Sequence, residues 1–292
     1  MLEAQSLTRV FGDTRVVDDV SFTVRPGRMT GFVGANGAGK TTTMRMLMGV
    51  LGATSGEVLW DGAPATAELR RNFGYMPEER GLYPRMQVRE QLVFFGRLHG
   101  MSTSQARSRA DHLLAHFGLE ERATSLLDDL SLGNQQRVQI AASLIHQPGA
   151  LVLDEPFSGL DPLAVDSMID LLHVEAADVP LLFSSHQLDL VERLCDDLVV
   201  LSAGRVVAAG SVEELRGHGE ERYRVVLDGQ DAAWLRDVRG VRVDDVDGAT
   251  ALLTLDGIGA SELASTVVGR APVLELARVR QPLSEIFREV TR

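Results

Sequence analysis

Four short apolar runs in the first two thirds of the chain are typical of strands buried in a parallel sheet. The runs are Thr30–Val33, Ala150–Leu153, Leu181–Ser185 and Leu198–Leu201. A strand that is covered on both faces is almost continuously apolar, whereas a half-exposed strand alternates. A glycine-rich loop follows the first run, and Lys40–Val50 after it has a helical pattern. The runs therefore predict an α/β core.

Two longer segments between the first and second runs have a helical pattern. They are Val88–Gly118 and Ser131–His146, and both are rich in Leu, Ala, Gln and Arg. We therefore expect a helical insertion into the α/β core, over about residues 82–146.

The pattern changes near Arg216–Glu221, where Gly217 and Gly219 interrupt it. The segments beyond it are predicted in the order strand, helix, strand, strand, helix, strand, helix: Tyr223–Asp228, Asp231–Val238, Val241–Val246, Thr250–Asp256, Ser261–Val268, Val273–Val279 and Leu283–Val290. The first six segments follow the split βαβ pattern. We expect a first domain over residues 1–215 and an accessory α+β domain over 220–292, with a ferredoxin-like strand order.

Composition and charge narrow the class of protein. A chain of 292 residues is long enough for one large domain and one small one. The net charge of −12 argues against nucleic acid as the main partner. A single cysteine, Cys195, excludes an intrachain disulfide and fits a reducing compartment. No apolar run approaches the roughly 20 residues of a membrane span, so we expect a cytoplasmic chain whose membrane spans, if any, belong to another subunit.

The only lysine among 29 basic residues lies in the segment Gly34–Thr41. This segment fits G-x-x-x-x-G-K-[ST] at every fixed position. In such a loop the backbone N–H groups surround a β-phosphate, and the glycines allow the backbone to come close. The compact ammonium of Lys40 fits between phosphate oxygens, where a planar guanidinium is too wide. Chance retention of one lysine in an arginine-rich chain is the alternative.

Two adjacent carboxylates, Asp154 and Glu155, end the second apolar run. At a strand end they can serve two roles. Asp154 can hold Mg²⁺ through water, with the Thr41 hydroxyl as a direct ligand. Glu155 can act as the general base that polarises an attacking water. The alternative is a solvated strand end without chemistry.

Other polar residues follow strands or precede helices. His186 ends the third run and can donate to a γ-phosphate, or it is a structural histidine. Ser131 is a plausible helix N-cap, and Gly133 leaves N–H groups accessible to an anion. An ordinary capped helix is the alternative there. Asp161 lies in a loop before Pro162, and its chemistry stays open.

Six segments in this order resemble the ATP-binding subunit of an ABC transporter. They resemble Walker A (Gly34–Thr41), the Q-loop (Gly74–Glu78), the signature loop (Leu130–Gln135), Walker B (Ala150–Glu155), the D-loop (Ser158–Asp161) and the switch histidine (His186). The resemblance covers about Leu2–Leu215. It implies a P-loop NTPase core with a mainly parallel sheet, an antiparallel N-terminal β region and a helical insertion, with ATP and Mg²⁺ bound.

The resemblance also implies a set of site residues. The expected ATP-binding residues are Phe11, Gly34, Ala35, Asn36, Gly37, Ala38, Gly39, Lys40, Thr41, Thr42, Ser131, Gly133, Asn134 and Asp161. The expected metal ligands are Thr41, Glu78 and Asp154, and the expected catalytic residues are Lys40, Glu155 and His186. Phe11 would stack on adenine; a core position is the alternative for this residue.

Three residues depart from the family pattern. Leu132 replaces the first glycine of the signature loop, Asn134 replaces its glutamine, and Glu78 stands where a glutamine is usual. These departures resemble the pattern of the branch of ABC exporters that extrudes drugs or sodium. In that branch the membrane subunit is a separate chain.

The resemblance implies a head-to-tail homodimer with ATP between Gly34–Thr41 of one subunit and Ser131–Asn134 of the other. Hydrolysis would power an exporter through a separate polytopic membrane subunit, which would hold this chain at the inner face of the membrane. One alternative is a soluble ABC-type ATPase that acts on ribosomes or DNA. A non-catalytic module that only binds ATP is another.

Overall fold

A six-stranded sheet forms the centre of the first of two compact units, Met1–Val212. The computed structural model describes residues 1–79, 81–217 and 222–279. In spatial order the strands are β10 (Arg205–Ser211), β9 (Asp197–Ser202), β3 (Met29–Val33), β8 (Leu181–Ser185), β7 (Ala150–Leu153) and β6 (Phe73–Met76). All neighbours are parallel except β10, which is antiparallel to β9. Every residue of β3, β7 and β8 is buried, as the continuous apolar runs predict.

An antiparallel sheet packs against this central sheet through a shared core. Its strands are β2 (Thr14–Val24), β1 (Leu2–Phe11), β4 (Ser55–Trp60) and β5 (Ala63–Pro64). The helix α1 (Lys40–Leu47) contributes Met44, Met46 and Leu47 to the same core cluster as Leu7 of β1 and Phe32 of β3. The N-terminal antiparallel region expected from the sequence is therefore confirmed.

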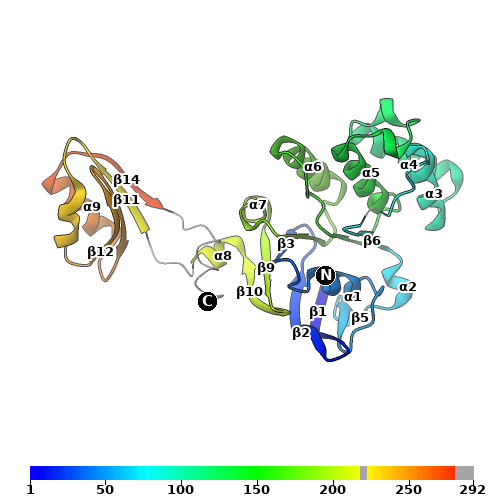
Figure 1. Cartoon of the computed structure of the whole chain (residues 1–292), viewed down its shortest axis with the longest axis horizontal. Helices are drawn as coiled ribbons and strands as arrows, with labels where there is room; N and C mark the ends of the chain where they lie inside the picture. The colour runs from blue at the N-terminus through cyan, green and yellow to red at the C-terminus, as the bar shows by residue number, and fades with distance from the viewer. Residues whose placement is uncertain (80, 218–221, 280–292) are drawn as a thin grey trace. The chain divides into compact units, whose positions relative to one another are not determined.

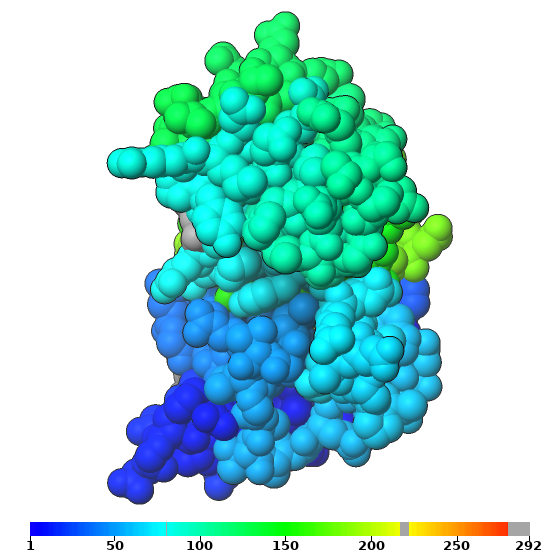
Figure 2. Space-filling model, turned by 90° about the vertical axis from the view of Figure 1, so that its right-hand side faces the viewer, coloured from blue at the N-terminus to red at the C-terminus, as the bar shows by residue number. Residues whose placement is uncertain are grey.

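Helices fill the connection between β6 and β7. They are α3 (Val88–Leu98), α4 (Thr103–His116), α5 (Leu132–Leu144) and the short 3₁₀ helices η1 (Glu120–Arg122) and η2 (Leu127–Asp129). A capping box formed by Ser102 and Gln105 begins α4. Figure 2 shows these cyan and green segments gathered above the blue N-terminal strands and α1. The helical insertion is confirmed.

Further helices connect the other strands of the first unit (Figure 1). The short α2 (Ala67–Arg70) precedes β6, α6 (Pro162–Glu175) joins β7 to β8, and α7 (Leu188–Leu194) joins β8 to β9. None of the described helices combines the length and hydropathy that crossing a bilayer requires.

The second unit begins at Glu213 and has a sheet of its own. After α8 (Val212–Gly217) come β11 (Arg222–Leu227), η3 (Ala232–Asp237), β12 (Val241–Asp247), β13 (Thr250–Leu255), α9 (Ala260–Arg270) and β14 (Val273–Val279). The spatial order is β12-β13-β11-β14, and every pair is antiparallel. Tyr223, Leu253 and Leu263 belong to a core cluster within this unit.

One predicted helix of the second unit differs from the structure. The segment Asp231–Val238 forms the 3₁₀ helix η3 and not an α-helix. The Asp231 carboxylate accepts a hydrogen bond from the N–H of Ala233, two residues on, at 2.7 Å. Asp competes in this way with the i to i+4 pattern and favours a tighter turn. The predicted helix at Leu283–Val290 lies outside the described residues.

Two histidines of the first unit stack on one another. His99 follows α3 and His146 follows α5, and their ring centroids are 3.7 Å apart with an interplanar angle of 8°. Burial, aided by the neighbouring His99 ring, lowers the pKa of His146 to about 4. Both imidazoles are therefore held in an environment that disfavours a charge.

This pair predicts a pH-dependent stability. The folded chain keeps His146 neutral down to about pH 4, whereas an unfolded histidine takes up a proton near pH 6.5. The unfolded chain therefore binds more protons between these pH values, and the free energy of unfolding falls as pH falls, by about 1–3 kcal/mol. Urea unfolding at pH 7 and pH 4.5 should show a smaller change in His146→Gln than in wild type. An unchanged pH dependence in that variant, equal to that of the exposed control His173→Gln, would contradict the assignment.

Candidate functional site

The loop of residues 34–39 connects β3 to α1 and approaches two neighbouring strands closely. Gly39 is the N-cap of α1 with φ 102°, in the left-handed region that favours glycine. A Cβ atom on Gly39 would lie 2.9 Å from the carbonyl oxygen of Val16 in β2. A Cβ atom on Gly34 would lie 2.5 Å from the carbonyl oxygen of Leu201 in β9. The shape of this loop therefore depends on both glycines.

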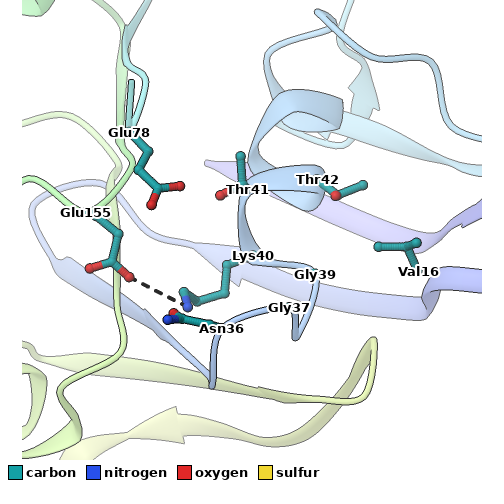
Figure 3. Close-up of a pocket in the computed structure, with 9 residues that line it drawn as sticks. All are labelled: Val16, Asn36, Gly37, Gly39, Lys40, Thr41, Thr42, Glu78 and Glu155. Atoms are coloured by element: carbon teal, nitrogen blue, oxygen red, sulfur yellow. Dashed lines mark ion pairs between the residues drawn. The ribbon is translucent and has the colours of Figure 1, made fainter. Parts of the chain in front are cut away.

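Lys40, the first residue of α1, is buried with its charge. Its Nζ donates a hydrogen bond to the carbonyl oxygen of Gly34 at 2.7 Å, across its own loop. The same Nζ lies 3.6 Å from Glu155 Oε1, an ion pair that Figure 3 marks. The side chain is only 7% exposed, so this cation is fixed above the loop by its surroundings. A phosphate in the loop would find the ammonium already in place.

Glu155 lies between two potential partners. Its Oε2 is 3.0 Å from His186 Nδ1, and its backbone N–H donates to Ser184 Oγ at 2.8 Å. Its φ of 50° is unusual for a residue with a long side chain. Strained backbone of this kind often occurs at functional sites because the surroundings impose it. The contact with His186 orients the carboxylate, which is the arrangement expected of a positioned base.

Asp154, the residue before it, is fully buried at the end of β7. Its Oδ1 accepts a hydrogen bond from Ser184 Oγ at 2.6 Å. Its Oδ2 is buried without a hydrogen-bond partner within the described residues. A buried carboxylate oxygen without a partner is costly. It fits a ligand that the protein itself does not supply, such as a metal ion or metal-bound water.

A cavity of about 300 Å³ brings eight of the predicted residues together. Its lining residues are Val16, Asn36, Gly37, Gly39, Lys40, Thr41, Thr42, Glu78 and Glu155 (Figure 3). The side chains of Thr41 and Glu78 point toward one another there. Hydroxyl and carboxylate oxygens are the ligands that Mg²⁺ prefers. With the unpartnered oxygen of Asp154, this set of residues fits a hard divalent cation.

Val16 is the only lining residue that the sequence did not predict. Its carbonyl oxygen faces both Gly39 and Gly204, at 2.9 Å and 2.6 Å from where their Cβ atoms would lie. In the sequence, only the presence of glycine at positions 39 and 204 indicates that another segment of the chain approaches closely. The sequence does not say which segment it is.

A second group of predicted residues lies at the N-termini of two helices. Ser131 caps α5 by accepting from the Asn134 N–H at 3.4 Å, and Asp161 caps α6 by accepting from the Ala164 N–H at 3.0 Å. Ser131 and Asp161 are exposed, and Gly133 is half-buried. None of the four lines the cavity around Lys40. The helix caps that the sequence predicts are therefore present, but they lie outside the cavity at the loop of residues 34–39.

Leu132, which departs from the usual signature loop, lies between the starts of these two helices. It is 40% exposed, and its Cδ2 lies 3.1 Å from where a Cβ atom on Gly159 would be. A Cβ atom on Gly133 would lie 3.4 Å from Leu160 Cδ2. The start of α5 therefore packs against the loop that leads into α6.

Phe11 is not a core residue, so that alternative is wrong. At the end of β1 it is 45% exposed. The guanidinium carbon of Arg9 lies 4.5 Å from the centroid of its ring. An exposed aromatic face that already attracts a planar cation is free to stack on another flat group. Phe11 does not line the cavity around Lys40, and its contact with a base stays a prediction.

Comparison with known proteins gives consistent relatives. Residues 17–158 match the sequence profile of the family described as ABC transporter. YhaQ of Bacillus subtilis, an uncharacterized ABC transporter ATP-binding protein, is 36% identical over 99% of this chain and 98% of its own length. The Nod factor export ATP-binding protein I of Paraburkholderia xenovorans is 33% identical over 99% of this chain and 96% of its own length.

Solved structures agree with this comparison. One that is described as the ATP binding subunit of an ABC transporter is 33% identical with a TM-score of 0.67. The match covers 74% of this chain and 92% of that one. The predicted α/β fold class is confirmed.

The position of Lys40 predicts the effect of two substitutions on nucleotide affinity. Lys40→Ala removes the cation, and Lys40→Arg keeps the charge in a guanidinium that is too wide for the loop. Both should weaken ATP binding by at least about tenfold, the factor that corresponds to 1.4 kcal/mol. Isothermal titration with Mg-ATP measures this. Wild-type affinity in Lys40→Arg would mean that charge alone suffices and that the loop does not select an ammonium.

Proposed function

Because the chain belongs to the ABC transporter family as an ATP-binding subunit, we propose that it hydrolyses ATP and thereby powers an exporter whose membrane subunit is a separate chain. The observation that carries hydrolysis is the arrangement of Glu155 between Lys40 Nζ at 3.6 Å and His186 Nδ1 at 3.0 Å. A carboxylate that is oriented from both sides at the end of a phosphate-type loop can act on a water beside the γ-phosphate.

Binding of the nucleotide uses the loop and the metal ligands. The N–H groups of residues 34–39 surround the β-phosphate, and the ammonium of Lys40 neutralises charge on the β- and γ-oxygens. Thr41, Glu78 and Asp154 would hold Mg²⁺, directly or through water. The ion would then neutralise phosphate charge and orient the phosphates. Thr42, Asn36 and the backbone of the loop complete the contacts, and Phe11 stacks on the base.

Hydrolysis needs a base and a stabilised leaving group. Glu155 accepts a proton from the attacking water as the water oxygen bonds to the γ-phosphorus. The bond from that phosphorus to the bridging oxygen breaks, and the charge stays on ADP. His186 keeps the Glu155 carboxylate oriented and can donate to the γ-phosphate. Lys40 stabilises charge that builds up on the transferred group.

We further propose that two copies of the chain associate head to tail, with ATP between them. The support is that the predicted site residues form two groups. One group lines the cavity around Lys40, and the other consists of exposed caps and N–H groups at the starts of α5 and α6. A helix N-terminus attracts an anion. Ser131, Gly133 and Asn134 of a second copy would therefore close the γ-phosphate side of the first site, with Asp161 nearby.

An exposed aromatic cluster supports a membrane subunit as partner. Tyr83 and Phe94 are 52% and 37% exposed, and their ring centroids are 5.9 Å apart. Beside them a cavity of about 310 Å³ is lined by residues that include Phe73, Leu82 and Phe95. Exposed apolar surface of this kind is typical of an interface. We assign it to cytoplasmic helices of the membrane subunit, which would hold this chain at the inner face of the membrane.

The second unit is proposed as an accessory domain. We keep the expected extents, 1–215 for the ATP-binding domain and 220–292 for the accessory domain, close to the division between Val212 and Glu213. Its described residues contain no glycine loop followed by lysine, so no catalytic step is assigned to it. A role in contact with the same domain of a second copy, or in regulation, fits this unit better than a catalytic role.

A ribosome- or DNA-associated role is the second candidate. The net charge of −12 disfavours it. Co-purification with a polytopic membrane protein supports the exporter, and co-purification with nucleic acid instead would favour the other role.

Substitution of Glu155 separates binding from hydrolysis. Glu155→Gln should keep ATP affinity and slow hydrolysis by about 10²-fold or more, the usual effect of a lost general base. It should also accumulate a dimer with ATP. Phosphate release and light scattering after gel filtration measure the two effects, with Glu120→Gln, exposed on η1, as the control. Equal hydrolysis by Glu155→Gln and wild type would remove Glu155 from the role of base.

Substitution of Ser131 tests the second half of the proposed site. Ser131→Arg places bulk and positive charge at the start of α5, where a phosphate should bind. It should abolish ATP-dependent association, while the monomer binds ATP normally through its own loop. Ser104→Arg, near the start of α4, is the matched control. Normal association of Ser131→Arg would show that Ser131 is only a helix cap.

A further inference from the structure

Two histidines and a glutamate from different helices meet on the first unit, away from the cavity around Lys40. His112 and His116 are four residues apart on α4, so they lie on one face of that helix. Glu175 is the last residue of α6. His112 Nε2 lies 3.0 Å and His116 Nδ1 2.8 Å from the same oxygen, Glu175 Oε1.

The two oxygens of Glu175 have different partners. Oε2 accepts a hydrogen bond from Arg109 Nη2 at 2.7 Å, which leaves Oε1 to the two imidazoles. The Glu175 side chain is only 5% exposed, whereas the rings of His112 and His116 are 47% and 39% exposed. Burial alone would raise the pKa of Glu175, but hydrogen bonds and charges of Arg109 and His112 lower it. One carboxylate oxygen of Glu175, Oε1, is therefore directed at two imidazole nitrogens.

The location of Glu175 calls for positive charge. The carbonyl groups at the end of a helix give it a partial negative charge, and a carboxylate there is unfavourable. Arg109 offsets one negative charge. A second cation at Oε1 would offset the remaining repulsion from the end of α6.

We propose that His112 Nε2, His116 Nδ1 and Glu175 Oε1 form a binding site for a divalent transition metal ion of the Zn²⁺ class. Two imidazoles and one carboxylate are a donor set that Zn²⁺ accepts. The three ligand atoms lie within 4.8 Å of one another. Zinc bonds of about 2.0–2.2 Å in tetrahedral geometry place ligand atoms roughly 3.3 Å apart. The observed 2.8 and 3.0 Å contacts therefore need to open by only a few tenths of an ångström.

The surroundings suit an ion with an open position. A cavity of about 440 Å³ is lined by Arg109, His112, His116 and Glu175, and it leaves room for water as a fourth ligand. Arg109 acts as a positioning residue, because its bond to Oε2 fixes the carboxylate for single-oxygen ligation. On binding, His112 would carry its remaining proton on Nδ1 and His116 on Nε2, so that each ligating nitrogen presents a lone pair.

A metal ion here would join two parts of the first unit. The helix α4 belongs to the insertion between β6 and β7, whereas α6 joins β7 to β8. A bridge between them would stabilise the insertion against the core. We expect Zn²⁺ to raise the thermal unfolding midpoint of the chain, since a ligand that binds only the folded state stabilises it.

The test is metal binding by the full chain without nucleotide. Protein stripped with a chelator is titrated with Zn²⁺ against a chromophoric competitor, and Co²⁺ absorption reports the coordination. Zn²⁺ should bind with a dissociation constant of about 1 μM or tighter, in a range common for protein ligand sites. Co²⁺ should give the intense visible bands of a four- or five-coordinate site with nitrogen ligands.

Variants decide which residues hold the ion. His112→Gln and His116→Gln should each weaken Zn²⁺ binding by ~10–100-fold or more. A loss of that size is usual when a residue that only orients a metal ligand is removed. His173→Gln, at an exposed histidine of α6 outside both sites, should leave this affinity unchanged. Both histidine substitutions are at exposed positions, so the variants should fold. The Co²⁺ spectrum of the wild-type chain tests the proposal without any variant.

Three outcomes would overturn the proposal. The first is Zn²⁺ affinity in wild type weaker than about 100 μM, or about −5.5 kcal/mol. The second is equal affinity in the variant with both His112→Gln and His116→Gln. The third is a Co²⁺ spectrum like that of the hydrated ion. In those cases the two imidazoles only donate hydrogen bonds to Glu175. The proposed ATP hydrolysis is independent of this result, because no residue is shared between the two sites.

Discussion

The rest of the site depends on how closely the loop of residues 34–39 approaches its neighbours. The backbones of β2 and β9 leave no room for a side chain at Gly39 or Gly34. The loop can therefore curl back on itself, and Lys40 Nζ reaches the Gly34 carbonyl oxygen at 2.7 Å. Because β3, β8 and β7 are parallel neighbours, their carboxyl ends share one edge of the sheet. This edge brings Lys40, Glu155 and His186 within contact distances.

The same chain has a second, separate set of groups that can bind an anion. Helices α5 and α6 begin side by side, joined by the packing of Leu132 near Gly159. In the usual signature loop this position is glycine, and the leucine fills the space against the loop before α6. The two helix starts thus form one surface. We propose that a second copy uses this surface to close the site around Lys40.

Strand predictions rested on burial, and burial is visible in the sequence. The runs Ala150–Leu153 and Leu181–Ser185 coincide with β7 and β8 because both strands are covered on both faces. The Gly34–Thr41 pattern contains five of the nine cavity residues. The family resemblance added Thr42 and Glu78, and the pair of carboxylates after the second apolar run pointed to Glu155. The short helix expected at Asp231–Val238 is present as a 3₁₀ helix, because a local hydrogen bond of the Asp231 carboxylate favours the tighter turn.

What the sequence could not give are contacts between distant segments. Val16 lines the cavity from β2, and nothing in its residue type marks it as part of the site. The spacing of His112 and His116 is readable, but Glu175 lies 59 residues after His116 and meets it only in the folded chain. Phe11 could not be assigned from its residue type alone, since exposure distinguishes a stacking surface from a core position.

The most direct test of the central claim mixes two chains that each lack one half of the site. One carries Lys40→Ala and the other Ser131→Arg, both with Glu155→Gln to slow hydrolysis. A mixed pair then has one intact site, formed by the loop of the second chain and the α5 start of the first. Native mass spectrometry with Mg-ATP should show each variant alone as a 31.7 kDa monomer and the mixture as a heterodimer with one ATP in its intact site. If the mixture stays monomeric while Glu155→Gln alone dimerises, or if either variant alone dimerises, the shared site is contradicted.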